Sequence, residues 1–232
     1  MKINTANLIV QINNISGELM TSRAAPYLYN GDAEPDISVN VSRKFYEEQV
    51  KKTPGLTFEE SEYLYSGWYF YEQFTNFGGI MLHASCVEYK GKAYLFSANS
   101  GTGKSTHTHL WLKYLDGARI INDDKPAIRL IDGTFYAFGT PWSGKTDESV
   151  YGGVPVGGIA FLSRGENNIE RVDGFSVLMN FLNQTVRPRD KALMSNTLDI
   201  LDKLLTTVPT YRFSCDMSEE AVKTAVNGMV GR

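Results

Sequence analysis

The segment from Ala93 to Ser105, AYLFSANSGTGKS, decides how this chain folds. An apolar run, Ala93–Ser97, leads into a glycine-rich loop, and a second apolar run around Thr106–Leu115 follows it. This order predicts a strand, a loop and a helix, which is the context of a phosphate-binding loop of the pattern Gly-x-x-x-x-Gly-Lys-Ser/Thr. A chance match in a surface loop is the weaker alternative, because both flanking elements are in place.

The residue types of the loop fit the binding of ATP with Mg²⁺. Gly101 and Gly103 let the backbone curl so that successive N–H groups point at phosphates. Lys104 supplies positive charge, Ser105 offers a hydroxyl ligand for Mg²⁺, and the following helix presents its N-terminus. Ala98 stands where the usual pattern has its first glycine. The predicted nucleotide-binding residues are Asn99, Ser100, Gly101, Thr102, Gly103, Lys104, Ser105 and Thr106.

An acidic pair, Asp123-Asp124, closes the next predicted strand, Ala118–Asn122. A helix, a turn at Asp116-Gly117 and this strand bring the chain back beside the phosphate loop. One carboxylate can hold Mg²⁺ and the other can accept the proton of an attacking hydroxyl. Taken alone, the pair would be a solvated turn before Pro126; together with the loop it indicates function.

The chain has three histidines, His83, His107 and His109. His83 belongs to the apolar segment before the strand of the loop, where an imidazole can orient a catalytic carboxylate. A hydrogen-bonded core histidine is an equally weighted alternative. His107 and His109 are two residues apart and face different sides of a helix, which argues against a zinc site.

Length and composition set limits on the class of protein. The 232 residues carry a net charge of −3, which gives no reason to expect nucleic acid or an anionic membrane as partner. The apolar runs Val154–Leu162 and Ile80–Val87 are too short to span a bilayer, and the start of the chain does not resemble a signal peptide. Cys86 and Cys215 are expected to be buried free thiols. We expect a cytoplasmic protein.

The order of the predicted elements is mixed α and β. We expect a small N-terminal α+β region at residues 1–77, laid against a nucleotide-binding core at residues 78–232. The first region has two strands and a helix after Thr57, which forms a capping box with Glu60. In the core, the predicted strands are Ile80–Tyr89, Ala93–Ser97, Ala118–Asn122, Ala127–Ile131, Phe135–Phe138, Val156–Leu162 and Tyr211–Cys215, and the later helices are Phe175–Asn183, Asp190–Thr206 and one beginning at Ser218.

Together, His83, the segment 97–106 and Asn122-Asp123-Asp124 resemble the catalytic core of HPr kinase/phosphorylase, and the loop is also similar to that of ATP-dependent phosphoenolpyruvate carboxykinase. The resemblance covers about residues 80–165. It implies an α/β fold with the mixed-sheet P-loop core of these families, and it is compatible with a homo-oligomer. It also implies that Lys104 and Ser105 bind triphosphate and Mg²⁺, that Asp123 is the base oriented by His83, and that Asp124 is a metal ligand.

The chain departs from the family pattern in several places. Thr106 stands where HPr kinases have Glu, and neither a Glu-Ile-Arg-Gly nor a Pro-Gly-Arg-Asn element is present; Arg187-Pro188-Arg189 is a loose substitute for the latter. The acceptor is therefore expected to differ from HPr. Short relatives of this type resemble kinases that phosphorylate a serine of a small modified-peptide precursor.

Two hairpins are predicted: a Lys90-Gly91 turn joins Ile80–Tyr89 to Ala93–Ser97, and Asp132-Gly133 joins Ala127–Ile131 to Phe135–Phe138. A candidate substrate loop follows the second hairpin, at Gly139–Lys145. Trp142 offers a rigid aromatic surface, and Ser143 and Lys145 can meet an anionic acceptor. The alternative, in which Trp142 packs on the core, is equally weighted. Further candidates for stabilising the transferred phosphoryl group are Arg164, Arg187 and Arg189.

The preferred function is an ATP- and Mg²⁺-dependent kinase acting on a hydroxyl, a serine of a peptide or protein. The first alternative is a non-catalytic nucleotide-binding regulatory module, which Ala98 and Thr106 favour. The second is a carboxykinase-type enzyme acting on a small carboxylic acid. We identify no second metal site or extra basic residues in the sequence to support it.

Overall fold

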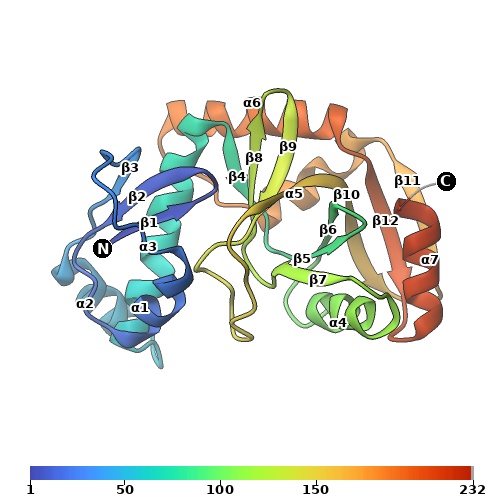
Figure 1. Cartoon of the computed structure of the whole chain (residues 1–232), viewed down its shortest axis with the longest axis horizontal. Helices are drawn as coiled ribbons and strands as arrows, with labels where there is room; N and C mark the ends of the chain where they lie inside the picture. Colours follow the sequence, from blue (N-terminus) through green and yellow to red (C-terminus); the bar gives the residue numbers. More distant parts are fainter. Residues whose placement is uncertain (231–232) are drawn as a thin grey trace.

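The computed structural model describes residues 1–230 and shows a mixed α/β protein with a small N-terminal sheet beside a large mixed sheet (Figure 1). In the small sheet, β2 pairs antiparallel with β1 and parallel with β3. Three α-helices and two 3₁₀ turns complete this region. Its elements are β1 (Lys2–Thr5), β2 (Leu8–Ile12), α1 (Glu18–Ala24), η1 (Ala25–Tyr27), β3 (Ile37–Val39), α2 (Arg43–Lys52), α3 (Phe58–Phe74) and η2 (Thr75–Phe77).

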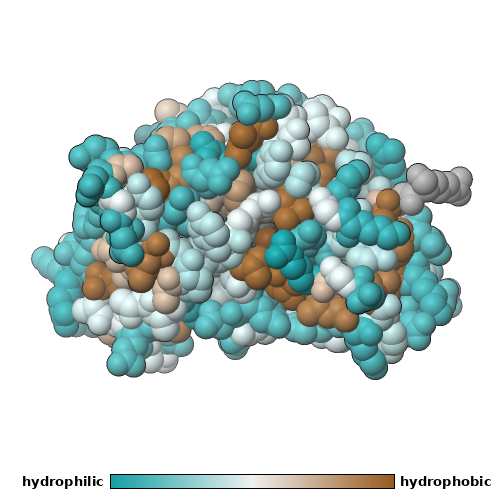
Figure 2. All heavy atoms as spheres, in the orientation of Figure 1, coloured by the Kyte–Doolittle hydropathy of each residue, from teal (hydrophilic) through white to brown (hydrophobic). Residues whose placement is uncertain are grey.

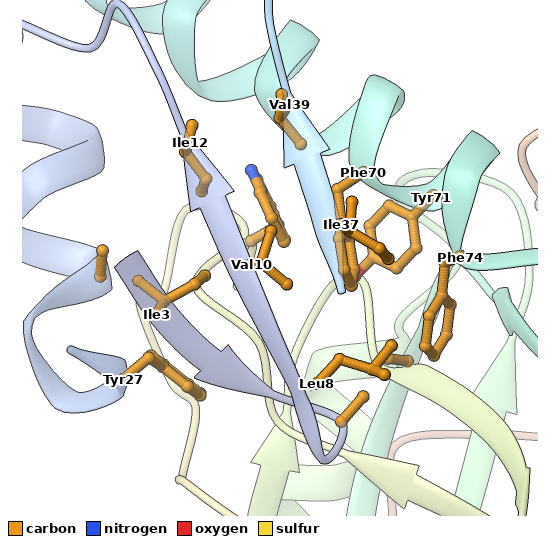
Figure 3. Close-up of a cluster of buried hydrophobic side chains, with 14 of the residues drawn as sticks. Ile3, Leu8, Val10, Ile12, Tyr27, Ile37, Val39, Phe70, Tyr71 and Phe74 are labelled. Atoms are coloured by element: carbon orange, nitrogen blue, oxygen red, sulfur yellow. The ribbon is translucent and has the colours of Figure 1, made fainter. Parts of the chain in front are cut away.

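Helix α3 is the longest helix of the N-terminal region, and the small sheet packs against it. The predicted capping box is confirmed: Thr57 Oγ1 accepts from the Glu60 N–H (3.1 Å) and Glu60 Oε2 accepts from the Thr57 N–H (2.8 Å). The helical segment ends at Gly78, whose φ of 72° lies in the left-handed region that glycine tolerates. The apolar face of α3 packs against the small sheet, with Phe70 and Phe74 lying beside strand residues of β2 and β3 (Figure 3).

The large sheet has the strand order β4-β8-β9-β10-β6-β5-β7, with β12 also pairing with β10 and β11 with β12. Its long central strand β10 pairs antiparallel with β9 near its start and parallel with β6 and β12 further on. The remaining elements are β4 (Gly79–Met81), β5 (Ala84–Tyr89), β6 (Lys92–Ser97), α4 (Lys104–Tyr114), β7 (Arg119–Asn122), β8 (Ala127–Ile131), β9 (Thr134–Phe138), β10 (Gly153–Arg164), β11 (Asn168–Val172), η3 (Gly174–Val177), α5 (Leu178–Gln184), α6 (Lys191–Thr207), β12 (Thr210–Cys215) and α7 (Glu219–Met229).

Helices cover both faces of the large sheet. Strand β6 shows why: successive side chains alternate between faces, so Leu95 joins a cluster with Phe181 of α5 and Leu204 of α6. The next residue, Phe96, joins the opposite cluster, which includes Trp111 of α4 and residues of α7. In Figure 1, α6 runs along the top and α4 lies below β5 and β7. Figure 2 shows a largely hydrophilic outer surface with apolar patches near the middle of this view.

Both expected hairpins form, each with the expected two-residue turn. Asp132 and Gly133 join β8 to β9 with φ values of 48° and 80°, and Lys90 and Gly91 join β5 to β6 in the same conformation. Positive φ at both positions is what a tight two-residue hairpin requires. Cys86 and Cys215 are buried free thiols, as expected. Within residues 1–230, no helix is both long and apolar enough to cross a membrane.

One predicted strand is wrong. The segment Ile80–Tyr89 is divided at Leu82-His83 into β4 and β5. The two halves have different neighbours, since β4 pairs with β8 whereas β5 pairs with β6 and β7. The break takes His83 out of the strand ladder, and its N–H instead donates to the Gln184 carbonyl (2.7 Å).

The expected boundary between residues 77 and 78 stays a prediction. The apolar core of the N-terminal region includes side chains from the later part of the chain, namely Met81, Ala127, Phe138, Trp142 and Val186. Elements that the sequence did not predict are β1, α1, α2 and β11. The helix expected at Phe175–Asn183 begins with the 3₁₀ turn η3 before α5.

His107 is a core residue, and we predict that it makes stability depend on pH. It lies between the rings of Phe96 and Phe213 (centroids 4.6 and 5.1 Å away), and its Nε2 accepts from Trp111 Nε1 (3.0 Å). Burial lowers the pKa of His107 to about 4 from an ordinary 6.5. Between pH 6.5 and 4, His107 is therefore protonated in the unfolded state but largely neutral in the folded state. Up to about 3 kcal/mol of unfolding free energy should be lost as pH falls from 6.5 to 4.

The measurement is urea unfolding of the wild type and of His107→Phe at several pH values between 4 and 7. The variant should be less stable at pH 7, because Trp111 Nε1 loses its acceptor, but should lose less stability on acidification. Parallel pH profiles for the two proteins would contradict this assignment.

Candidate functional site

The predicted order of strand, glycine-rich loop and helix forms, with the candidate phosphate loop between β6 and α4. Gly101 and Gly103 both have positive φ (78° and 118°), the conformation that a glycine adopts without strain. Ala98 is not among the non-glycine residues with positive φ, so its replacement of the usual glycine leaves the backbone unstrained. Gly103 precedes α4 and no side chain caps that helix, which leaves its first N–H groups available to an anion.

The Lys104 side chain contacts the start of the loop. It is 7% exposed, and Nζ donates to the carbonyl oxygens of Ala98 (3.0 Å) and Asn99 (3.4 Å). Burial lowers the pKa of Lys104, while the negative charges of Asp124 and Asp123 act in the opposite direction. A largely desolvated cation that faces two carboxylates is well placed to bind phosphate, because phosphate oxygens can replace the two weaker carbonyl acceptors.

Asp123 is a buried carboxylate that joins three segments of the chain. Its Oδ1 accepts a short hydrogen bond from Ser85 Oγ of β5, and its Oδ2 accepts from Thr146 Oγ1 (2.8 Å) in the loop after β9. Ser85 Oγ lies 2.6 Å from Thr108 Oγ1 of α4, the helix that follows the phosphate loop. These contacts fix the acidic pair relative to α4.

Asp124 is the more accessible carboxylate, with a side chain 21% exposed. Its Oδ1 lies 3.3 Å from His83 Nε2, and its Oδ2 forms an ion pair with Lys125. Burial raises the pKa of Asp124, but the hydrogen bond from His83 and the charge of Lys125 outweigh it and lower the pKa to about 2. This arrangement corrects one expectation: His83 contacts Asp124 and not Asp123.

Gln184 is a site residue that sequence reasoning missed. Its Oε1 lies 2.9 Å from His83 Nδ1, and its Nε2 donates to Asn99 Oδ1 of the phosphate loop (2.9 Å). A chain of contacts thus runs from Asp124 through His83 and Gln184 to Asn99. No local signal marks Gln184, because it ends α5 and is 101 residues from His83 in sequence.

The loop and the acidic pair line one large cleft of about 1330 Å³. On the core side, its lining includes Ser100, Gly101, Gly103, Lys104, Ser105, Thr106, His83, Asp123, Asp124 and Lys125. Residues of the N-terminal region form the facing wall. The other expected loop residues, Asn99 and Thr102, line a smaller adjoining cavity of about 550 Å³, together with Asn180, Asn183 and Gln184.

The residues of the candidate substrate loop lie in different environments. Trp142 is buried, lies stacked on the Phe70 ring (centroids 4.9 Å apart) and donates from Nε1 to the Tyr63 carbonyl (3.0 Å). Of the two equally weighted alternatives, the structure supports core packing: Trp142 is a core residue and offers no surface to a substrate. Ser143 is buried as well, whereas Lys145 is exposed and lines the large cleft.

The three candidate arginines lie in different places. Arg164 donates to the carbonyl oxygens of Gly101 (2.7 Å) and Thr102 (3.3 Å), so it holds the outside of the phosphate loop. Arg187 is exposed and lies outside the lining of both cavities beside the loop, as does Arg189. Only Arg164 of the three is thus brought to the site.

The donor set of the large cleft fits Mg²⁺. Ser105 and Asp124 both line it and offer a hydroxyl and an ionised carboxylate, which are oxygen ligands of the type that Mg²⁺ prefers. Among residues 1–230, no cluster of three or more His, Cys, Asp or Glu forms a ready metal cage. Mg²⁺ bound with a nucleotide does not need one, because phosphates and water complete its shell.

Comparison with known proteins gives a distant similarity of fold. No family model matches the chain, and the search of curated proteins found no match. Among solved structures, the chain is similar to the HPr(Ser) kinase/phosphatase from Coxiella burnetii, with 12% identity and a TM-score of 0.38 over 63% of this chain and 93% of that one.

Proposed function

We propose that this protein transfers the γ-phosphoryl group of ATP to a hydroxyl group, a serine of a peptide or protein, with Mg²⁺ as cofactor. The observation that supports this most is the common cleft. It joins a strand–loop–helix phosphate cradle, a largely buried Lys104 and two carboxylates. A cation and an acidic pair lining one cleft are the parts that phosphoryl transfer requires.

Each part has a defined role in this proposal. Lys104 and the loop N–H groups bind the phosphates, and Ser105 would hold Mg²⁺ together with phosphate oxygens and water. The bound ion would supply neutralisation of developing charge. The acceptor oxygen forms a bond to the γ-phosphorus as the bond from phosphorus to the β,γ-bridging oxygen breaks, so ADP leaves. The hydroxyl proton passes to a carboxylate. Since the transition state is loose, a weakly basic carboxylate is sufficient if it is well positioned.

The geometry favours Asp124 as this proton acceptor. Its side chain is 21% exposed whereas Asp123 is buried, and its Oδ1 contacts His83. A base held by a second group is the arrangement that positions proton transfer. In the alternative, which the family resemblance implied, Asp123 is the base and Asp124 is a ligand of Mg²⁺.

The test is a binding and transfer measurement on the purified protein. We expect ATP with Mg²⁺ to bind in calorimetry, and γ-labelled ATP to transfer its label to serine-containing peptides with stoichiometric release of ADP. Binding of ATP with no transfer to any peptide and no hydrolysis would instead support a non-catalytic nucleotide-binding module. ADP formation that depends on a small carboxylic acid, with no labelled peptide, would support carboxykinase-type chemistry.

A further inference from the structure

The large cleft extends well beyond the phosphate loop. Its volume of about 1330 Å³ exceeds the roughly 300–1,000 Å³ that is usual for the site of one small ligand. The phosphate loop and the acidic pair line one side of it, and the N-terminal region lines the other. There is thus room for a second ligand next to a bound nucleotide, against the N-terminal wall.

Three leucines from three separate elements form the apolar part of this wall. They are Leu19 of α1, Leu56 in the turn between α2 and α3, and Leu64 of α3. Leu64 is 43% exposed although it belongs to a helix whose opposite face is buried. Leu19 and Leu56 are half-buried. A single exposed leucine is ordinary, but three leucines that line one cleft indicate a contact surface. We call these three residues the leucine wall.

Hydrogen bonds hold the leucine wall in a fixed shape. Glu62 of α3, which is fully buried, accepts from the N–H groups of Ser16 (3.0 Å) and Gly17 (2.7 Å) and so attaches the start of α1 to α3. The capping box at Thr57 fixes the turn that carries Leu56. A preformed apolar surface loses little conformational entropy when a ligand binds it.

The charged residues around the leucine wall do not form an anion site. Arg23 is committed to protein partners: its guanidinium lies 4.9 Å from the Tyr63 ring centroid, donates to the Gly144 carbonyl and pairs with Asp147 (3.6 Å). Lys145 is accessible, but the carboxylate of Glu60 also lines the cleft. These surroundings suit a peptide segment, with an apolar side chain and polar backbone on either side of it, better than they suit a small dicarboxylate.

We propose that the leucine wall binds an apolar side chain of the acceptor, so that the substrate is a peptide or protein segment with an apolar residue near its serine. This inference rests on the proposed function. Because one continuous cleft connects the wall with Asp124 and the phosphate loop, binding of the apolar side chain sets which hydroxyl reaches the γ-phosphate. The N-terminal region then selects the acceptor while the core performs the transfer.

The test uses γ-labelled ATP and a degenerate peptide library with one fixed serine, in which each other position is scanned in turn. Wild-type protein should prefer Leu, Ile, Met or Phe at one fixed distance from the serine. For the best peptide, the variant Leu56→Asp/Leu64→Asp should raise KM about tenfold or more, with a smaller change in kcat. The conservative double variant Leu56→Met/Leu64→Met should keep KM near the wild-type value.

Leu28→Asp is the matched control, because Leu28 is 52% exposed in the same region but lies outside the lining of the cleft. It should leave KM unchanged. Near-ultraviolet circular dichroism checks folding, and if the double variant is unfolded, Leu64→Ser is used in its place. Label transfer without an apolar preference, or equal KM values for the wall variant and Leu28→Asp, would overturn this inference alone. Bound ATP with no labelled peptide would overturn the proposed function as well.

Discussion

Lys104→Ala should abolish measurable phosphoryl transfer and weaken ATP binding more than any other single substitution in the loop. Lys104 is largely buried, and Nζ is bonded only to backbone carbonyls at 3.0 and 3.4 Å, which a triphosphate can displace. Removing one preorganised donor to developing charge typically lowers kcat by about 10²–10³. Lys104 also supplies a full charge in a site with little water, so we expect a loss at or above the upper end of this range.

The same substitution should leave the stability of the free protein nearly unchanged. Burial already lowers the pKa of Lys104, which shows that desolvation opposes its charge in the folded state. Deleting a buried cation therefore removes a cost together with two hydrogen bonds. Calorimetric ATP titration and thermal unfolding of the same samples separate the two effects.

Lys113→Ala is the control for Lys104→Ala, since Lys113 lies exposed on the same helix and contacts the ring of Tyr114. It should retain wild-type ATP affinity and transfer. An undiminished ATP affinity in Lys104→Ala would show that the loop is not the phosphate site. The proposed function would then fail.

The elements that the sequence predicted well are those determined by local interactions. The glycine-rich loop before α4, the capping box at Thr57 and the tight turn at Asp132-Gly133 each depend on backbone conformations that a few neighbouring residues determine. The position of the acidic pair followed from connectivity, because a short helix and turn return the chain to the loop. Residue types at known spacing were sufficient in all of these cases.

The features that the sequence did not predict depend on distant partners. The segment Ile80–Tyr89 reads as one apolar strand, but its halves pair with different strands, and local periodicity carries no information about that change. The contact of His83 with Gln184 likewise joins β4–β5 to the end of α5. The family resemblance assigned His83 to Asp123, whereas the break between β4 and β5 turns it to Asp124.

The burial of Trp142 has a signal in the sequence, a glycine within a helix. Gly67 occupies the middle of α3, where glycine is unfavourable by about 1 kcal/mol relative to alanine, so a packing reason should be sought. A Cβ at this position would lie 2.7 Å from Trp142 Cδ1. The glycine is what lets the indole ring lie against the helix.

Changing each of the two carboxylates to asparagine should have a different effect: Asp124→Asn should mainly reduce transfer, and Asp123→Asn should mainly reduce stability. Asp124→Asn should lower kcat by about 10²–10⁴, the range for loss of a general base, while the protein stays folded and still binds ATP. Asn is almost isosteric with Asp, so the contact with His83 can persist, but the amide cannot accept a proton. ATP affinity and single-turnover transfer measured on the same preparation give this split.

Asp123→Asn should instead reduce stability. Its two oxygens accept from Ser85 Oγ and Thr146 Oγ1, and an amide nitrogen cannot accept from a hydroxyl. One buried hydroxyl must lose or reverse its bond, which should cost about 1–3 kcal/mol in unfolding free energy. Transfer should fall less than in Asp124→Asn once the folded fraction is taken into account. Near-complete loss of transfer in Asp123→Asn, with normal stability and an active Asp124→Asn, would reassign the base to Asp123 and leave His83 to position Asp124 for Mg²⁺.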